Sequence, residues 1–374
     1  MKIIVAMDSF KGSLTAVQAC TIVADALRAV VPDATVVTKP MADGGEGTAA
    51  ALMAATGGEW IKVPAMGPLP DMRVTGGFVW LAETRTAIVE MALVSGLPLL
   101  APAQQNPLQT TTYGTGQLIQ AAAAHGAARI LLAIGGSATV DGGVGAAQAC
   151  GWSFLTADGR EVPPGGGHLS EITRIIPPSA VFGPEVDVLC DVNNPLCGPR
   201  GAARTYGPQK GATPEMVETL EANLEHLARV VKEQLGRDIR DLPGAGAAGG
   251  LAAGAVAFLD AHLVSGIDEV MSCSRLAEEV ADADWVITGE GKFDEQSLQG
   301  KVVSGVARLA HAAGAKVAVL AGQVRLPESA YRLAHIETAE PCMTDTTTLE
   351  EALANAEPLL TQAARRFTQT HLRR

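Results

Sequence analysis

The sequence predicts an α/β protein in which a doubly wound parallel sheet carries an inserted, mixed α/β domain. Three observations support this prediction. Both ends of the chain alternate short apolar runs with amphipathic segments of helical periodicity, which is the pattern of parallel sheets. The middle of the chain has short strand-like pieces joined by brief turns, typical of hairpins. The 374 residues include 41 glycines and only 4% aromatic side chains, a composition that favours tight turns over a β-sandwich.

The two ends of the chain predict one sheet built from both of them. The expected strands are 3–6, 35–37, 285–288 and 316–321. The expected helices are 14–30, 48–55, 302–313 and a closing segment from Leu349, whose basic residues suit a helix C-terminus. In parallel sheets of this kind, ligands bind in the loops at the C-terminal ends of the strands.

The middle of the chain predicts the inserted domain. Its expected short strands are 73–77, 78–82, 86–91, 130–134 and 186–190. A long, polar, amphipathic helix is expected at 214–235. We therefore expect a discontinuous first domain, 1–62 plus 283–374, and a second domain over 63–282.

Composition excludes several classes of function. The net charge is −12 with no basic stripe, which argues against nucleic acid and anionic membranes as partners. Six scattered cysteines without a C-x-x-C pair indicate reduced thiols. The first apolar run is too short for a signal peptide, and the uncharged segment 244–259 is a poor membrane span. We expect a soluble, cytoplasmic protein that must gather cations locally to bind an anion.

The most informative stretch is 130–143, where an apolar run ends in two glycine pairs that enclose Ser137, Thr139 and Asp141. Such a turn lets the backbone approach a ligand and exposes N–H groups, two hydroxyls and a carboxylate. The alternative is a plain structural turn. Three further segments share the format of an apolar lead-in followed by glycine, acid and hydroxyl: 5–13, 41–48 and 286–294. Together the four turns predict one site for an anion and a metal.

Common nucleotide motifs are absent from the sequence. There is no P-loop and no protein-kinase H-R-D or D-F-G. The segment 244–249 matches G-x-G-x-x-G, but Asp241-Leu242-Pro243 precedes it in place of a strand. Tight helix packing is therefore the favoured interpretation, with a phosphate at the helix N-terminus as the alternative. Thr139 stands where a nucleophile elbow needs its last glycine, which argues against a serine hydrolase.

The first strand–helix connection offers an anion site. Asp8 and Lys11 lie there beside Ser9, and Ser13 is either a ligand residue or the helix N-cap. Asp43, in the second glycine turn, could hold Mg²⁺ through water or could simply favour a helix N-terminus.

Two more groups of candidates follow predicted strands. Glu290, Lys292 and Asp294 form a charged cluster, with Lys301 close behind, and solvated loop charges are the alternative. Asp191 follows the strand 186–190 and is a candidate general base or metal ligand, or else forms an Asx turn.

Lys210 lies between turn residues, which fits a lysine that contacts phosphate and equally fits an ordinary surface lysine.

Taken together, these motifs resemble the type I glycerate kinases. The segments that carry the resemblance span the chain in order: 8–13, 41–48, 106–108, 115–116, 134–143, 190–196, 207–212, 244–251 and 287–301. Each glycine turn alone is weak, but the combination is specific. The resemblance implies ATP-dependent phosphorylation of D-glycerate, usually to 2-phosphoglycerate. It also implies a flavodoxin-like domain made of both chain ends, with an inserted α/β domain.

The sequence departs from the family pattern at a few positions. Lys292 replaces an arginine, which keeps the charge but loses the bidentate fork. Val140 stands where asparagine is common, so any ligand contact of that asparagine is lost. No acid or glycine is removed.

Phosphoryl transfer needs a base for the attacking hydroxyl, with Mg²⁺ and cations to absorb charge. From residue type and placement we expect Asp191 or Asp8 as the base, and Asp43 with Asp294 or Glu290 at Mg²⁺. Lys11 would hold phosphate or the glycerate carboxylate. The remaining expected binding residues are Ser9, Ser13, Gly135, Gly136, Ser137, Thr139, Lys210, Lys292 and Lys301. We expect the four turns to meet at a cleft between the domains that closes on binding.

Other functions stay open at this point. A non-catalytic protein that binds a small acid would take up glycerate without releasing ADP. A hydrolase or lyase would turn over without nucleotide. The 2- and 3-hydroxyls are both possible acceptors, because both lie in one small pocket.

Overall fold

The computed structural model describes residues 1–180, 182–344 and 346–372. The chain forms two compact units, and each is described by itself. Unit 1 comprises 1–43, 50–57 and 265–374, and unit 2 comprises 44–49 and 58–264. The division into domains near residues 62 and 282 stays a prediction, because spatial proximity alone does not show which segments fold on their own.

Unit 1 is built on a five-stranded sheet in which every neighbouring pair is parallel. Its strands in chain order are β1 (Lys2–Met7), β2 (Thr35–Thr38), β11 (Trp285–Gly289), β13 (Lys316–Ala321) and β15 (Thr338–Pro341). Across the sheet they lie in the order β2-β1-β11-β13-β15, which is the 2-1-3-4-5 order of flavodoxin. The predicted doubly wound sheet made of both chain ends is confirmed.

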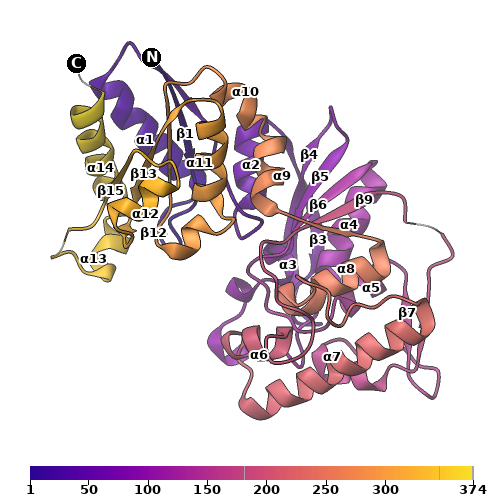
Figure 1. The fold of residues 1–374 in the computed structure, drawn as a ribbon. Coiled ribbons are helices and arrows are strands. Elements are labelled where there is room, and N and C mark those ends of the chain that lie inside the picture. Colours follow the sequence, from indigo (N-terminus) through magenta and orange to yellow (C-terminus); the bar gives the residue numbers. More distant parts are fainter. Residues whose placement is uncertain (181, 345, 373–374) are drawn as a thin grey trace. The chain divides into compact units, whose positions relative to one another are not determined.

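Helices cover both faces of this sheet. They are α1 (Ala16–Val30), α2 (Thr48–Thr56), α9 (Gly266–Cys273), α10 (Leu276–Val280), α11 (Val302–Ala312), α12 (Glu328–Leu333), α13 (Leu349–Ala354) and α14 (Ala356–His371). Figure 1 shows α1 and α14 side by side, and their apolar faces bury Val23, Leu27 and Phe367 against Ile3 and Val5 of β1. The closing segment from Leu349, predicted as helical, forms the two helices α13 and α14.

The strand order creates a switch point between β1 and β11. The chain leaves β1 toward β2 on one side and leaves β11 toward β13 on the other. The register pairs Met7 with Gly289, so Asp8 and Glu290 follow neighbouring strands at the same edge. Ligands of doubly wound sheets bind where connections diverge in this way.

Unit 2 contains a mixed six-stranded sheet in the order β10-β9-β6-β5-β4-β3. The strands are β3 (Glu59–Met66), β4 (Arg73–Leu81), β5 (Thr86–Glu90), β6 (Arg129–Ala133), β9 (Glu185–Leu189) and β10 (His262–Val264). β3, β4 and β5 pair antiparallel, and β5, β6, β9 and β10 pair parallel. The predicted mixed domain is confirmed in its type.

One predicted break in this sheet is wrong. The segments 73–77 and 78–82 form the single strand β4, which pairs along its length with β3. Close packing explains the two glycines inside this strand, Gly76 and Gly77. A Cβ on Gly76 would overlap Val94, and a Cβ on Gly77 would lie 2.5 Å from the Ile61 carbonyl oxygen.

The helices of unit 2 belong to two hydrophobic clusters, and only one of these clusters contains residues of the six-stranded sheet. The main helices are α3 (Ala92–Ser95), α4 (Tyr113–His125), α5 (Val144–Ala149), α6 (Ala202–Tyr206), α7 (Pro214–Leu235) and α8 (Leu251–Leu259), beside a small β7–β8 pair (Ser153–Leu155 and Arg174–Ile176). The predicted helix at 214–235 is confirmed as α7, which Thr213 caps. Among the described helices, none combines the length and the apolar character needed to cross a bilayer.

The glycine-rich start of α8 serves close backbone packing. A Cβ on Gly249 would overlap the Thr139 carbonyl, and one on Gly250 would lie 2.9 Å from the Gly142 Cα. The Gly142 N–H donates to the Gly249 carbonyl at 3.1 Å. The G-x-G-x-x-G match therefore lies against the 139–143 turn, as tight helix packing requires.

We expect Gly249→Ala to lower the free energy of unfolding by about 3 kcal/mol. Gly249 has φ +65° and no room for a Cβ, so strain and overlap add. Gly126 is a matched control, because it has φ +104° but open space around it, and Gly126→Ala should cost about 1 kcal/mol. Urea unfolding measures both, and equal losses would show that close packing at α8 does not matter.

Candidate active site

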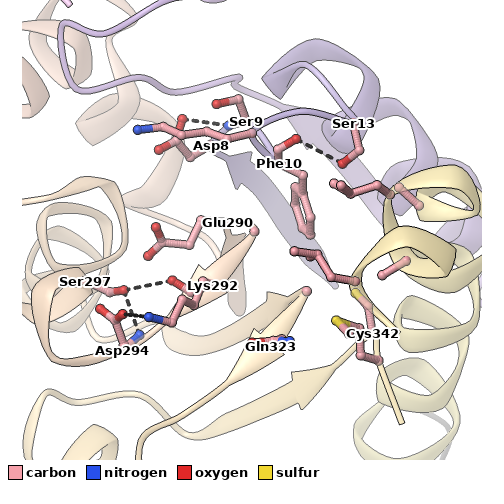
Figure 2. A pocket seen from close by; sticks show the side chains of 18 of the residues that line it. Asp8, Ser9, Phe10, Ser13, Glu290, Lys292, Asp294, Ser297, Gln323 and Cys342 are labelled. Atoms are coloured by element: carbon pink, nitrogen blue, oxygen red, sulfur yellow. Dashed lines mark hydrogen bonds and ion pairs between the residues drawn. The ribbon is translucent and has the colours of Figure 1, made fainter. Parts of the chain in front are cut away.

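Unit 1 has a cavity of about 440 Å³ at the C-terminal edge of its parallel sheet. Figure 2 shows it between the loop after β1 and the loop after β11. Its lining includes nine of the predicted site residues: Asp8, Ser9, Lys11, Ser13, Asp43, Glu290, Lys292, Asp294 and Lys301. The volume lies in the range of small-molecule sites. Residues from three of the four predicted turns thus line one cavity.

Asp8 is the most perturbed acid of this cavity. Its N–H donates to the Gly289 carbonyl at 2.9 Å, and its Oδ1 accepts from the Ser9 N–H at 2.6 Å. Burial, followed by the negative charges of Asp43 and Glu290, raises the pKa of Asp8 to about 7, although Lys11 acts in the opposite direction. At neutral pH the group can therefore both accept and release a proton.

Glu290 is held in place by its backbone. Its carbonyl accepts from the Gly322 N–H at 3.1 Å, and the next carbonyl accepts from the Gln323 N–H at 3.1 Å. Burial raises the pKa of its carboxyl. Its Oε1 is buried and has no hydrogen-bond partner among the described residues. A buried acceptor without a donor is costly unless a ligand or ion satisfies it.

Asp294 is already engaged. Its Oδ2 lies 2.7 Å from the Lys292 Nζ, and its Oδ1 accepts from the Gln296 N–H at 3.0 Å as the cap of a short 3₁₀ turn. The Lys292 partner lowers the pKa of the Asp294 carboxyl. Asp294 therefore orients Lys292 at the cavity wall.

Ser13 does not cap α1. Its hydroxyl donates to the Phe10 carbonyl at 3.0 Å, whereas Thr15 is the N-cap and forms a capping box with Gln18. The helix-cap alternative for Ser13 is therefore wrong, and its side chain stabilises the 8–13 loop instead.

The far wall of the cavity is apolar, which the sequence analysis missed. It consists of Phe10, Cys342, Met343, Leu349, Ala352, Leu353, Ala356 and Leu359. The sequence offered one signal for this wall, the two leucines of the segment 349–354. In the structure both leucine side chains are exposed and lie outside the hydrophobic core.

In unit 2, the 135–143 turn is more closed than predicted. The Asp141 carboxylate is buried and accepts from the Thr112 N–H (2.7 Å), the Thr112 hydroxyl (2.9 Å) and the N–H groups of Gly143 and Gly145 (3.2 and 3.3 Å). Thr139 is also fully buried. The expectation of an exposed carboxylate and two exposed hydroxyls is therefore wrong, because the turn folds onto its own unit and Asp141, Thr139 and Ser137 (9% exposed) are all buried.

Lys210 holds the same turn from inside. Its Nζ donates to the Ser137 hydroxyl and to the Thr139 carbonyl, both at 2.7 Å, and the residue is only 2% exposed. Burial lowers the pKa of Lys210 to about 7, against the opposing effect of Asp141. The surface-lysine alternative is wrong, and Lys210 positions Ser137.

The segment 44–49 packs against Gly135, at the start of the 135–143 turn. The Gly135 N–H donates to the Gly44 carbonyl at 3.2 Å, and a Cβ on Gly135 would lie 2.5 Å from the Gly45 Cα. The Glu90 carboxylate, at the end of β5, accepts from the Gly47 and Ala49 N–H groups at 2.9 and 3.1 Å. Glu90 is not among the residues predicted from the sequence, although an acid at the end of an apolar strand is a usable signal. Gly136 has φ +74°.

Asp191 lies in unit 2, shortly after β9, and is exposed. It is not among the described residues that line the unit 1 cavity. Its role stays a prediction.

Comparison with known proteins decides the family, since a profile described as the glycerate kinase family matches residues 3–372. The chain belongs to the glycerate kinase family. It is 44% identical over 367 residues to the glycerate kinase of Halalkalibacterium halodurans, covering 97% of this chain and 96% of the relative. It is 41% identical to the glycerate 2-kinase of Escherichia coli K12, and the match covers 99% of this chain and 98% of the relative.

A solved structure agrees with this assignment. The crystal structure of a putative glycerate kinase 2 from Salmonella typhimurium LT2 matches with a TM-score of 0.87 and 40% identity, over 99% of this chain and 98% of that chain. The family makes the chain a phosphotransferase with glycerate as acceptor, and kinase activity implies ATP as donor. The finer type I assignment stays a prediction.

We expect Asp8→Asn to stabilise this glycerate kinase at neutral pH. The Asp8 pKa of about 7 in the fold lies above the ordinary 3.8, so the folded state binds more protons between these values and stability falls as pH rises through that window. At about pH 8 the variant should exceed wild type by roughly 2 kcal/mol, less than full desolvation would give because the side chain opens on the cavity. The difference should vanish near pH 4.

Urea unfolding across this pH range measures the effect. Asp294→Ala is the matched control, because it removes a cap and the Lys292 partner and should lower stability by about 1 kcal/mol. A pH-independent difference for Asp8→Asn would contradict a raised pKa.

Proposed function

We propose that this chain transfers the γ-phosphoryl group of ATP, with Mg²⁺, to the 2-hydroxyl of D-glycerate. The observation that carries the proposal is the unit 1 cavity, where four acids and three lysines line the switch point of a flavodoxin-like sheet. Names of relatives support the choice of reaction, since one of them is a glycerate 2-kinase.

The acids of the cavity fit a divalent cation. Asp43 and Glu290 offer the carboxylate oxygens that Mg²⁺ prefers, and the buried Glu290 Oε1 has no donor among the described residues. Their charges also help to raise the pKa of Asp8, a repulsion that a cation would relieve. We assign Mg²⁺ to Asp43 and Glu290. When bound, it would supply charge neutralisation for the transferring phosphoryl group. Asp294 is left to orient Lys292.

The lysines supply the remaining positive charge. Lys11 lies on the loop after β1, Lys292 on the strand after Glu290, and Lys301 at the start of α11. A protein of net charge −12 attracts a triphosphate only where such cations are concentrated. We assign the three lysines to the phosphate oxygens.

Asp8 is our choice for the base. Its pKa of about 7 lies near neutral pH, and a base with a pKa near the pH of the reaction is the most effective in proton transfer. In the step proposed, the glycerate hydroxyl gives its proton to Asp8 as its oxygen bonds to the γ-phosphorus, and ADP leaves with the bridging oxygen. Asp191 remains the alternative base. In unit 2, Lys210 would keep Ser137 in a fixed position for a substrate contact.

The reaction is tested by incubating the full chain with MgATP and D-glycerate, with L-glycerate and tartronate in parallel. We expect ADP release that depends on D-glycerate, and ³¹P NMR coupling that places the phosphate on C2. Phosphate on C3 would overturn the regiochemistry. Binding of glycerate without ADP release would overturn the catalytic function.

The two candidate bases are separated by Asp8→Asn and Asp191→Asn. We expect Asp8→Asn to lower kcat by about 10²-fold or more, because general base catalysis contributes that much. Asp191→Asn should change kcat much less. Asp33→Asn, at an exposed acid of unit 1 outside the cavity lining, is the control. A large loss at Asp191 with little at Asp8 would move the base to Asp191.

A further inference from the structure

The unit 1 cavity has two chemically different halves. Acids and lysines line the half at the ends of β1 and β11, as Figure 2 shows for Asp8, Glu290 and Lys292. The other half is apolar and is contributed by Phe10, by the chain after β15, and by α13 and α14. Glycerate has three carbons and no apolar part, so it does not account for the second half.

Apolar side chains of the helix α13 line this half of the cavity, and they remain exposed. Every residue of α13 is described, and none of them is buried. Leu349 is 64% exposed and Leu353 is 42% exposed, and both line the cavity. A ligand that covers this leucine surface would be stabilised, because apolar area would be removed from water.

The helix is nevertheless well defined. Thr348 and Glu351 form a capping box at its start, with the Thr348 hydroxyl 2.9 Å from Glu351 Oε2. The Asn355 N–H donates to the Glu351 carbonyl at 2.9 Å at its end. Its apolar side therefore faces the cavity as a fixed wall.

One loop connects the two halves. Asp8 and Lys11 belong to the polar half, whereas Phe10 packs in the core and contributes to the apolar half. A Cβ placed on Gly12 would lie 3.7 Å from Leu353 Cδ2, so the loop passes directly against α13. A single ligand that fills the cavity would touch both halves, and it would need an anionic, metal-binding end and an apolar end.

We propose that Leu349 and Leu353 of α13, together with Phe10, form the base subsite for the ATP of this enzyme, with the triphosphate directed toward the lysines at the strand ends. This proposal rests on the proposed kinase function and names where unit 1 takes the nucleotide. The cavity volume of about 440 Å³ suits such a ligand. Because apolar contacts are non-directional, the base adds affinity mainly through the area that it buries.

The test compares binding of MgADP and magnesium pyrophosphate to the full chain by isothermal titration calorimetry. The variants are Leu353→Asn and the double variant Leu349→Asn/Leu353→Asn. Leu333→Asn is the matched control, because Leu333 is 83% exposed on α12 and does not line the cavity. Neutral asparagine avoids a new charge near the phosphates, and thermal melting checks that each variant folds.

We expect Leu353→Asn to raise the Kd of MgADP about 10-fold, since losing one buried leucine contact has that effect, and the double variant to raise it further. The Kd of magnesium pyrophosphate and the KM for glycerate should stay within about 2-fold of wild type, as should every value for Leu333→Asn. Unchanged MgADP binding in folded double variants would overturn the subsite while leaving the kinase function intact. A wild-type chain that binds no nucleotide would overturn the proposed function itself.

Discussion

The parallel register of β1 against β11 is the constraint on which the site depends. Because Met7 pairs with Gly289, the next residues, Asp8 and Glu290, emerge together where the two connections diverge. Gly322 and Gln323, after β13, then bond to the backbone of Glu290 and Gly291 and close one side. The position of the acids therefore follows from sheet geometry, and the surrounding loops add the lysines and the apolar wall. A shift of this register would move Asp8 away from Glu290 along the edge of the sheet.

This concentration of acids has a cost that explains much of the local chemistry. Burial and the repulsion between neighbouring carboxylates raise the pKa of Asp8. The buried Glu290 Oε1 has no donor among the described residues. Such strain is typical of functional sites, where stability is reduced in favour of activity. By contrast, Asp294 is fully engaged with Lys292 and a backbone N–H. The contrast between satisfied and unsatisfied acids is what separates a structural role from a candidate catalytic role here.

In unit 2, an acid and a lysine near a glycine turn are buried and hydrogen-bonded within the unit, whereas in unit 1 such residues line a cavity. Its glycine turn buries Asp141 among hydroxyl and N–H donors, and Lys210 reaches Ser137 and Thr139 from inside. The glycines there admit neighbouring backbone, from Gly45 on one side and from the start of α8 on the other. A turn that resembles a ligand loop in sequence is thus held by contacts within its own unit, and its polar side chains Ser137, Thr139 and Asp141 are all buried.

The sequence by itself determined the alternation of strands and helices at both chain ends, the helix Pro214–Leu235 and the strand Lys316–Ala321. It also determined nine residues of the cavity, because chemistry-bearing side chains in glycine turns after apolar runs lie at strand ends. Tertiary structure decided that β4 continues through Gly76 and Gly77, that Asp141 is buried, and that Leu349 and Leu353 line the cavity. Periodicity reports which side of an element is apolar, whereas the partner that meets that side comes from distant parts of the chain and is set by packing.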